Sequence, residues 1–137
     1  MDYKKYFENQ NTEKQIKKLT RKYKNKKVVL YGAGMYSQAL LENYDLSGLN
    51  IVAIADRSFV TEENKEFFGF KAINTNELKT LDYDVILLCV YDVIKVWDFL
   101  RDELLPNTKN ANVKIQPAVY ETLISIFKEY FNSRNSK

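Results

Sequence analysis

Short apolar runs alternate along the chain with segments in which apolar residues recur every three or four positions. The apolar runs are short, rich in β-branched residues and bounded by glycine or polar turns, which is typical of buried strands. They lie at 27–31 (KVVLY), 51–56 (IVAIAD), 83–90 (YDVILLCV) and 111–116 (ANVKIQ), with a shorter strand near 71–73. The periodic segments predict amphipathic helices over 34–44, 92–105 and 118–131.

A further helix is predicted before the first strand. Ile16, Leu19 and Tyr23 recur at helical spacing within residues 2–25, where glycine and proline are absent. Its narrow apolar stripe would dock on the domain or on a second subunit. The predicted organisation is therefore a basic N-terminal helix (1–25), one nucleotide-binding domain (26–131) and a frayed tail (132–137).

Alternating buried strands and amphipathic helices require parallel pairing with right-handed crossovers. The pattern predicts a Rossmann-like three-layer α/β sandwich, with a five-stranded parallel sheet in the order 3-2-1-4-5 and an extra N-terminal helix. One short helix also carries a sequence signal at its start. Asn74 is placed to cap it, and Glu77 follows three residues later as in a capping box.

Two of the four glycines stand directly after the first strand, at Gly32 and Gly34. In a dinucleotide-binding turn the first glycine permits the sharp bend and the second lets a pyrophosphate approach the backbone. The following helix would direct free N–H groups at an anion. Ser37 occupies the third glycine position and is small enough for close packing. The turn and the start of its helix (32–37) are the predicted phosphate site: Gly32, Ala33, Gly34, Met35, Tyr36 and Ser37.

Further candidate residues follow the other strands. Asp56 ends the second strand 22 residues after Gly34, where an acid meets a ribose hydroxyl, or else it caps the next turn. Arg57 either contacts a phosphate or faces water. Tyr91 either lies against a base or sugar or covers the sheet edge. Tyr36 either stacks on a ligand or partly blocks the turn.

The segments VVLYGAGMYSQALLENY, IVAIADRS and FGFKAINTNELKTLDYDVILLCVYDVI give residues 26–105 a resemblance to a recurrent bacterial domain. That domain is the Rossmann-like module of surface-polysaccharide and nucleotide-sugar enzymes, found beside acetyltransferase, epimerase and glycosyltransferase domains. The resemblance implies a nucleotide or nucleotide-sugar ligand held through Gly32, Gly34 and Asp56. It also implies a fragment or subunit of a sugar transferase-type enzyme.

Composition narrows the chemistry. The chain has 137 residues, 45% of them hydrophobic, and it contains no histidine, which removes the commonest general base and metal ligand. Cys89 is the one cysteine and lies in an apolar run, so no internal disulfide is possible and a cytoplasmic location is expected. No catalytic constellation, metal-site spacing, signal peptide or transmembrane run is visible.

The net charge of +3 is unevenly distributed. Residues 1–27 hold ten basic and three acidic residues, whereas the remaining chain holds eleven basic and fifteen acidic residues. We read the basic segment as a solvated helix, with a homo-oligomer or a catalytic domain as its possible partner, and do not expect nucleic acid.

Three functions stay open from the sequence. The first is a module that binds a nucleotide or nucleotide sugar, with NAD(P) as another candidate ligand. The second is a small NAD(P)- or S-adenosylmethionine-dependent enzyme. The third is a ligand-free interaction or dimerisation domain.

Overall fold

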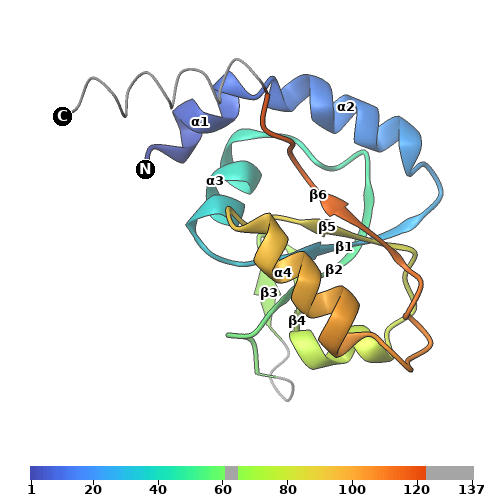
Figure 1. Cartoon of the computed structure of the whole chain (residues 1–137). Helices are drawn as coiled ribbons and strands as arrows, with labels where there is room; N and C mark the ends of the chain where they lie inside the picture. Colours follow the sequence, from blue (N-terminus) through green and yellow to red (C-terminus); the bar gives the residue numbers. More distant parts are fainter. Residues whose placement is uncertain (61–64, 123–137) are drawn as a thin grey trace.

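The computed structural model describes residues 1–60 and 65–122. It has a central sheet with helical segments on both faces (Figure 1). The strands are β1 (Lys27–Tyr31), β2 (Asn50–Asp56), β3 (Glu66–Phe67), β4 (Phe70–Asn74), β5 (Val85–Leu88) and β6 (Lys114–Pro117). The α-helices are α1 (Tyr3–Asn9), α2 (Thr12–Lys22), α3 (Met35–Asn43) and α4 (Val93–Phe99). A 3₁₀ helix, η1 (Thr75–Lys79), and a π-helical turn, η2 (Leu100–Leu104), complete the described elements.

The sheet has six strands in the order β3-β4-β2-β1-β5-β6, and β3 runs antiparallel to β4. The prediction of a five-stranded, wholly parallel Rossmann-like sheet is therefore wrong. The extra strand arises because Phe68 and Gly69 both have positive φ angles, 52° and 81°, which is the geometry of a two-residue hairpin turn. A strand of two residues is too short to show a period of two, so the sequence pattern missed it.

Alternate residues of each central strand enter two separate hydrophobic cores. Val28 and Leu30 of β1 belong to the core beneath α1, α2 and α3, where Phe7 and Leu40 are fully buried. Val29 and Tyr31 belong to the core that includes side chains from η1, η2 and the start of β6. Because both faces of the sheet are covered, its strands are nearly continuous runs of apolar residues.

The N-terminal segment forms two helices rather than the single helix that its pattern predicts. Between them, Asn11 adopts a left-handed conformation with a φ of 55°. A right-handed helix cannot continue through such a residue, so α1 ends before it and α2 begins after it. The hydroxyl of Thr12 donates to the carbonyl of Phe7 at 2.6 Å across this break. The bend lets α1 pack on α3 while α2 continues along the sheet (Figure 1).

Other predicted elements have clear outcomes. The capping box at Asn74 is confirmed, since Glu77 accepts from the Asn74 backbone N–H at 2.8 Å. The helix predicted over 118–131 does not include residues 118–122, and its remainder and the 132–137 tail lie outside the described residues.

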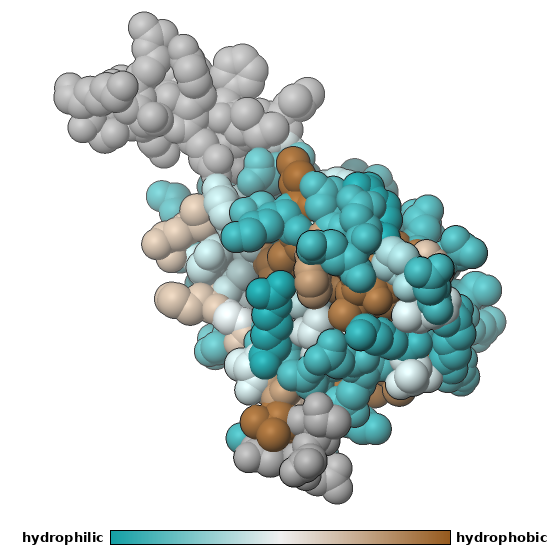
Figure 2. Space-filling model, turned by 60° about the horizontal axis from the view of Figure 1, so that its bottom comes forward, coloured by the Kyte–Doolittle hydropathy of each residue, from teal (hydrophilic) through white to brown (hydrophobic). Residues whose placement is uncertain are grey.

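Hydrophilic residues cover most of the face shown in Figure 2, where hydrophobic ones appear only as small separate groups. Within residues 1–60 and 65–122, no helix combines the length and the apolar character that a membrane crossing requires.

Candidate functional site

The glycine turn leaves the middle of the sheet, because β1 lies between β2 and β5. Gly32 has a φ of +114°, a conformation that only glycine adopts readily. A Cβ at this position would lie 2.6 Å from the carbonyl oxygen of Cys89 and 2.7 Å from Cγ1 of Val90. The Gly32 N–H donates to the carbonyl of Ala55 at 2.9 Å. Gly32 therefore serves the fold, by letting the chain turn against the end of β5.

Gly34 stands in open space, with no atom within 4 Å of the position that a Cβ would occupy. It is the N-cap of α3, and its carbonyl accepts from Gln38 at 3.0 Å. The backbone N–H groups from Gly34 to Ser37 have no acceptor among the residues that the structure describes. Such a row of free donors at the positive end of a helix dipole favours an anion.

Ser37 contributes a further polar group without a hydrogen-bond partner in the described chain. Its hydroxyl is fully buried in the first turn of α3, and within the described chain it has no hydrogen-bond partner. A buried polar group without a partner carries a desolvation penalty of roughly 1–3 kcal/mol. In the sequence this residue appears only as a small substitute for glycine; the missing partner is visible only in the structure.

Asp56 holds the glycine turn in place. Its Oδ1 accepts from the Ala33 N–H at 2.9 Å, and its Oδ2 accepts from the N–H and the hydroxyl of Ser58 at 2.9 and 2.6 Å. The predicted turn-capping role is therefore present. The carboxylate lies at the end of β2 and lines a pocket, and Oδ1 accepts one bond, so the group retains acceptor capacity.

The pocket lies at the carboxyl ends of β1, β2 and β5 and has a volume of about 760 Å³. This volume lies within the range of about 300–1,000 Å³ that is usual for small-molecule sites. It adjoins the glycine turn through two residues, since Asp56 bonds the turn and Val90 contacts Gly32. Its lining includes Tyr31, Asp56, Arg57, Val90, Lys95 and Phe99.

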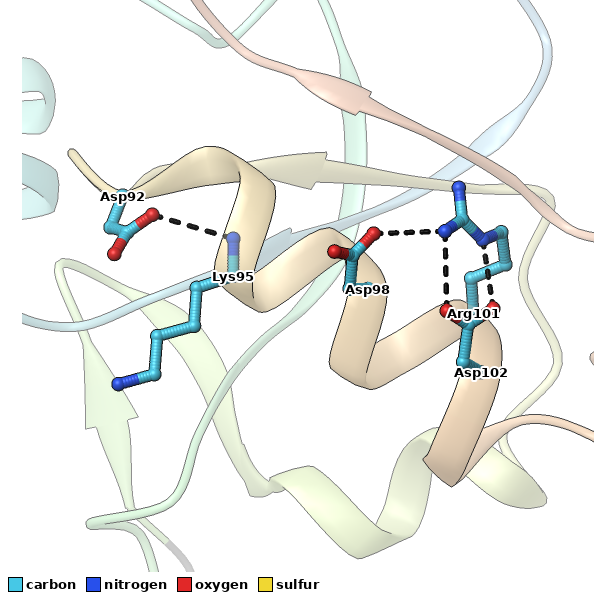
Figure 3. Close-up of polar contacts among 5 residues, drawn as sticks. All are labelled: Asp92, Lys95, Asp98, Arg101 and Asp102. Carbon is cyan, nitrogen blue, oxygen red and sulfur yellow. Dashed lines mark hydrogen bonds and ion pairs between the residues drawn. The ribbon is translucent and has the colours of Figure 1, made fainter.

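Positive charge reaches the pocket from two directions. The guanidinium of Arg57 lies over the ring of Phe99, with its carbon 4.7 Å from the ring centroid. Lys95 extends its ammonium away from the acidic residues of α4 (Figure 3). Neither cation forms an ion pair with a carboxylate in the described chain. Both remain available to a ligand.

The other charged residues of α4 and η2 are engaged within this segment. Arg101 bonds Asp98 at 2.8 Å and Asp102 at 3.0 Å, whereas Asp92 accepts from the backbone N–H of Lys95 and caps α4 (Figure 3). The Asp102 carboxyl has a pKa below its usual value because Arg101 donates a hydrogen bond to it. Asp98 and Asp102 share the single charge of Arg101, so this trio keeps one net negative charge, and Glu103 adds another carboxylate to the pocket lining.

The two tyrosines predicted near the ligand belong to a different environment. Tyr36 is 5% exposed and packs edge-on against Phe7 and Tyr3 of α1, with ring centroids 4.8 and 5.6 Å apart. Tyr91 is 47% exposed, and its ring lies 5.9 Å from that of Tyr6. Neither lines the pocket. The Tyr36 side chain leaves the Cβ side of Gly34 open, since no atom lies within 4 Å of that position.

Cys89 lies 1% exposed at the end of β5, and burial raises the pKa of its thiol to about 12. A thiol in this state is not a nucleophile near neutral pH. Among the described residues, no three acidic or cysteine side chains are grouped as metal ligands. Of the residues predicted for the site, Asp56 and Arg57 line the pocket, whereas none of residues 32–37 does. The turn is joined to the pocket by the bond from Ala33 to Asp56, and the side chains of Tyr36 and Tyr91 lie toward α1.

Sequence reasoning missed Lys95 and Phe99 as lining residues. The period of the helix marks Val96 as inward-facing, but it gives no indication that the neighbouring side chains border a pocket. Arg57 over Phe99 joins residues 42 positions apart (99 − 57), which no local pattern reveals.

Comparison with known proteins gives one match, to a family model. Neither the curated proteins nor the solved structures yielded a match. Residues 24–96 match the family model described as C2185-like, N-terminal. The matched region runs from just before β1 into α4. This match covers more than half of the 137 residues, so the chain belongs to the C2185-like N-terminal domain family.

Proposed function

We propose that the carboxyl edge of the sheet binds a nucleotide or nucleotide sugar, with a phosphate on the glycine turn. The observation that carries this proposal is the row of four backbone N–H groups, Gly34 to Ser37, that have no acceptor in the described chain. A phosphate oxygen accepts several such bonds at once and is stabilised by the helix dipole.

The pocket beside the turn supports the nucleoside or sugar part of the ligand. Asp56 offers an acceptor for sugar hydroxyls, while the Arg57 guanidinium over the Phe99 ring offers a cation and an apolar surface beside which a base or sugar can lie. Lys95 adds a cation at the same opening. In sheets of this kind, ligands occupy the crevice outside the carboxyl ends of the strands, where the strand order reverses. Here that reversal lies between β1 and β5.

The biological setting is part of the same proposal and has a separate basis. The resemblance of residues 26–105 to modules of polysaccharide and nucleotide-sugar enzymes favours a role in surface-sugar biosynthesis, as a fragment or subunit of a transferase-type enzyme. NAD(P) is the competing ligand for this pocket. The sequence contains no recognisable catalytic constellation, and for that reason we propose binding and not catalysis by this chain alone.

A specific observation favours a second candidate, a ligand-free interaction domain. Three donors of the protein itself already occupy the Asp56 carboxylate. If the turn has become purely structural, the aromatic surface around α1 and Tyr91 would serve a partner instead.

The test is a thermal-shift and calorimetric panel on the full chain, comprising uridine-diphosphate sugars, NAD, NADP and S-adenosylmethionine. We expect at least one nucleotide to raise the melting temperature. A ligand at 100 times its Kd stabilises the native state by about 2.7 kcal/mol, a shift that is easily measured.

Two variants locate the site. Gly34→Asp places a negative charge among the free N–H groups and should abolish binding while the protein stays folded, since its Cβ meets no atom. Asn43→Asp adds the same charge at the other end of α3 and should leave binding intact. Absence of any shift across the panel, or equal loss in both variants, would contradict the proposal.

A further inference from the structure

A second groove lies between α2 and the segment that follows β6. It has a volume of about 470 Å³ and is lined on one side by Lys14, Lys18 and Lys22. These residues are spaced four apart, so they form one stripe along the helix, with about 6 Å of rise between neighbours. The opposite wall includes Gln116 and Tyr120.

The wall opposite the lysines is fixed by hydrogen bonds to α2 and to the residues that flank it. The side-chain amide of Gln15 forms a reciprocal pair with the backbone of Tyr120: its Nε2 donates to the carbonyl and its Oε1 accepts from the N–H, both at 2.8 Å. Gln10 accepts from the Thr122 N–H at 2.7 Å. The hydroxyl of Tyr23 donates to Gln116. The groove is therefore a built feature and not a chance gap between exposed side chains.

The positive charge of this stripe is not neutralised within the described chain. Lys14 and Lys18 form no ion pair there, and Lys22 donates to the amide oxygen of Gln116 at 3.1 Å. The ion pair on α2 joins Lys17 to Glu13, which line a groove on the other flank of the helix. Among the residues that the structure describes, Glu121 is the one carboxylate that lines the lysine groove, and it accepts from the Tyr6 hydroxyl.

Tyr120 gives the groove an aromatic element. Its side chain is 51% exposed although its backbone is held on both sides by Gln15. A basic groove that follows a phosphate backbone, with an exposed aromatic ring for stacking, is the arrangement that binds single-stranded nucleic acid. We propose that this groove binds a single strand of DNA or RNA, with phosphates along Lys14, Lys18 and Lys22 and a base on Tyr120.

The groove changes the interpretation of the basic segment, which the sequence alone predicts to be a solvated helix. In the sequence, the aromatic residues near the lysines are mostly outside the lysine cluster, which favours a solvated helix. The fold supplies the missing aromatic residue from a position 106 residues beyond Lys14 (120 − 14).

An anionic membrane is a poorer match for the same lysines. A helix that lies in a membrane surface must expose an apolar face. The apolar residues of α2, Ile16 and Leu19, are each only 6% exposed and pack in the domain core. An acidic peptide would satisfy the lysines but would make no use of the exposed ring of Tyr120.

The experiment measures fluorescence anisotropy of a labelled oligo-dT of about 12 nucleotides, titrated with the full chain between 50 and 200 mM salt. This length lies within the range of about 4–16 nucleotides occupied by single-strand sites. The double variant Lys14→Gln/Lys18→Gln is compared with Lys17→Gln/Arg21→Gln. The control removes the same charge from the opposite flank of α2, where both residues line the other groove.

We expect the groove variant to weaken binding and to reduce the salt slope by about 1.4, or about 0.7 for each lost phosphate contact, and the control to retain the wild-type slope. Tyr120→Ala should weaken binding at least about fivefold, the equivalent of about 1 kcal/mol of stacking, and Tyr120→Phe should preserve it. Circular dichroism confirms that each variant is folded.

Several results would overturn the proposal. These are the absence of binding at 50 mM salt, equal loss in the two double variants, and an unchanged affinity for Tyr120→Ala. Displacement of the oligonucleotide by polyglutamate at equal charge would instead assign the groove to an acidic partner. Tighter binding to phosphatidylserine vesicles than to the oligonucleotide would assign it to a membrane surface.

Discussion

Replacing each of the two turn glycines by alanine separates the structural part of the turn from the part that we propose faces a ligand. At Gly32 the new Cβ would lie 2.6 Å from a backbone oxygen, at a φ of +114°. At Gly34 it would meet nothing within 4 Å, and the backbone is extended, with a φ of −86°. The same chemical change, two residues apart, should therefore have two different outcomes.

The magnitudes follow from these geometries. Holding a non-glycine residue in the Gly32 conformation costs about 1–3 kcal/mol, and forcing a methyl group against the Cys89 backbone costs about 1–3 kcal/mol more. Gly32→Ala should therefore lower the free energy of unfolding by about 2–6 kcal/mol, a large share of the usual 5–15 kcal/mol. At roughly 4 °C per kcal/mol, its melting temperature should fall by about 8–24 °C.

Gly34→Ala should change the free energy of unfolding by less than about 0.5 kcal/mol. Reduced freedom of the unfolded chain favours alanine by a few tenths, and its poorer N-capping disfavours it by a similar amount. Urea denaturation followed by circular dichroism measures both variants against the wild type. A Gly32→Ala protein as stable as the wild type, or a Gly34→Ala protein that loses as much as Gly32→Ala, would refute the geometry assigned to the turn.

Three other predictions concern packing and ionisation. Phe7→Ala should lower the free energy of unfolding by about 3–5 kcal/mol, because the fully buried Phe7 ring joins α1 to Tyr36 of α3. Urea denaturation measures this change, and a decrease below about 1 kcal/mol would show that α1 does not belong to the core. Cys89 should react with a thiol reagent only after unfolding, and rapid labelling of the native protein would contradict its burial. Because folding raises the pKa of this thiol from 9.0 to about 12, the free energy of unfolding should decrease as the pH increases above 9. Lys27 bonds Asp82 at 2.6 Å and holds the pKa of that carboxyl below its ordinary value of 3.8. The stabilisation from this pair should therefore be lost as the pH falls through the lowered pKa. An Asp82 pKa at or above 3.8 in an NMR titration would contradict the bond.

The central part of the fold could be predicted from sequence because burial on both faces leaves an unmistakable pattern. β1, β2 and β5 are continuous apolar runs, and the glycine after Tyr31 marks where the first of them ends. The capping box at Asn74 is equally local, since its two partners lie three residues apart. Signals of this kind depend on neighbours along the chain and not on the tertiary structure.

The sheet edge and the N-terminal segment could not be predicted in the same way. The β3–β4 hairpin turns through Phe68 in a left-handed conformation, which is rare for a residue of this size. Asn11 interrupts a helix pattern that is otherwise uniform between Tyr3 and Lys22. Both features are decided by tertiary packing, which outweighs local preference at these points.

The candidate site divides along the same line. The positions of Gly32, Gly34 and Asp56 follow from strand ends, so the sequence places them at one edge of the sheet. The burial of Tyr36 against α1 and the missing partner of Ser37 depend on contacts between segments distant along the chain. Only the folded structure shows which tyrosines leave the site and which N–H groups stay open to it.

The most direct test of the central claim is a two-dimensional ¹⁵N–¹H NMR titration of the full chain with the nucleotide that gives the largest thermal shift. If a phosphate occupies the glycine turn, the amide resonances of Gly34, Met35, Tyr36 and Ser37 should move most, and Gly34→Asp should remove these changes. Large changes confined to other parts of the molecule, with these four resonances unmoved at saturation, would contradict the account.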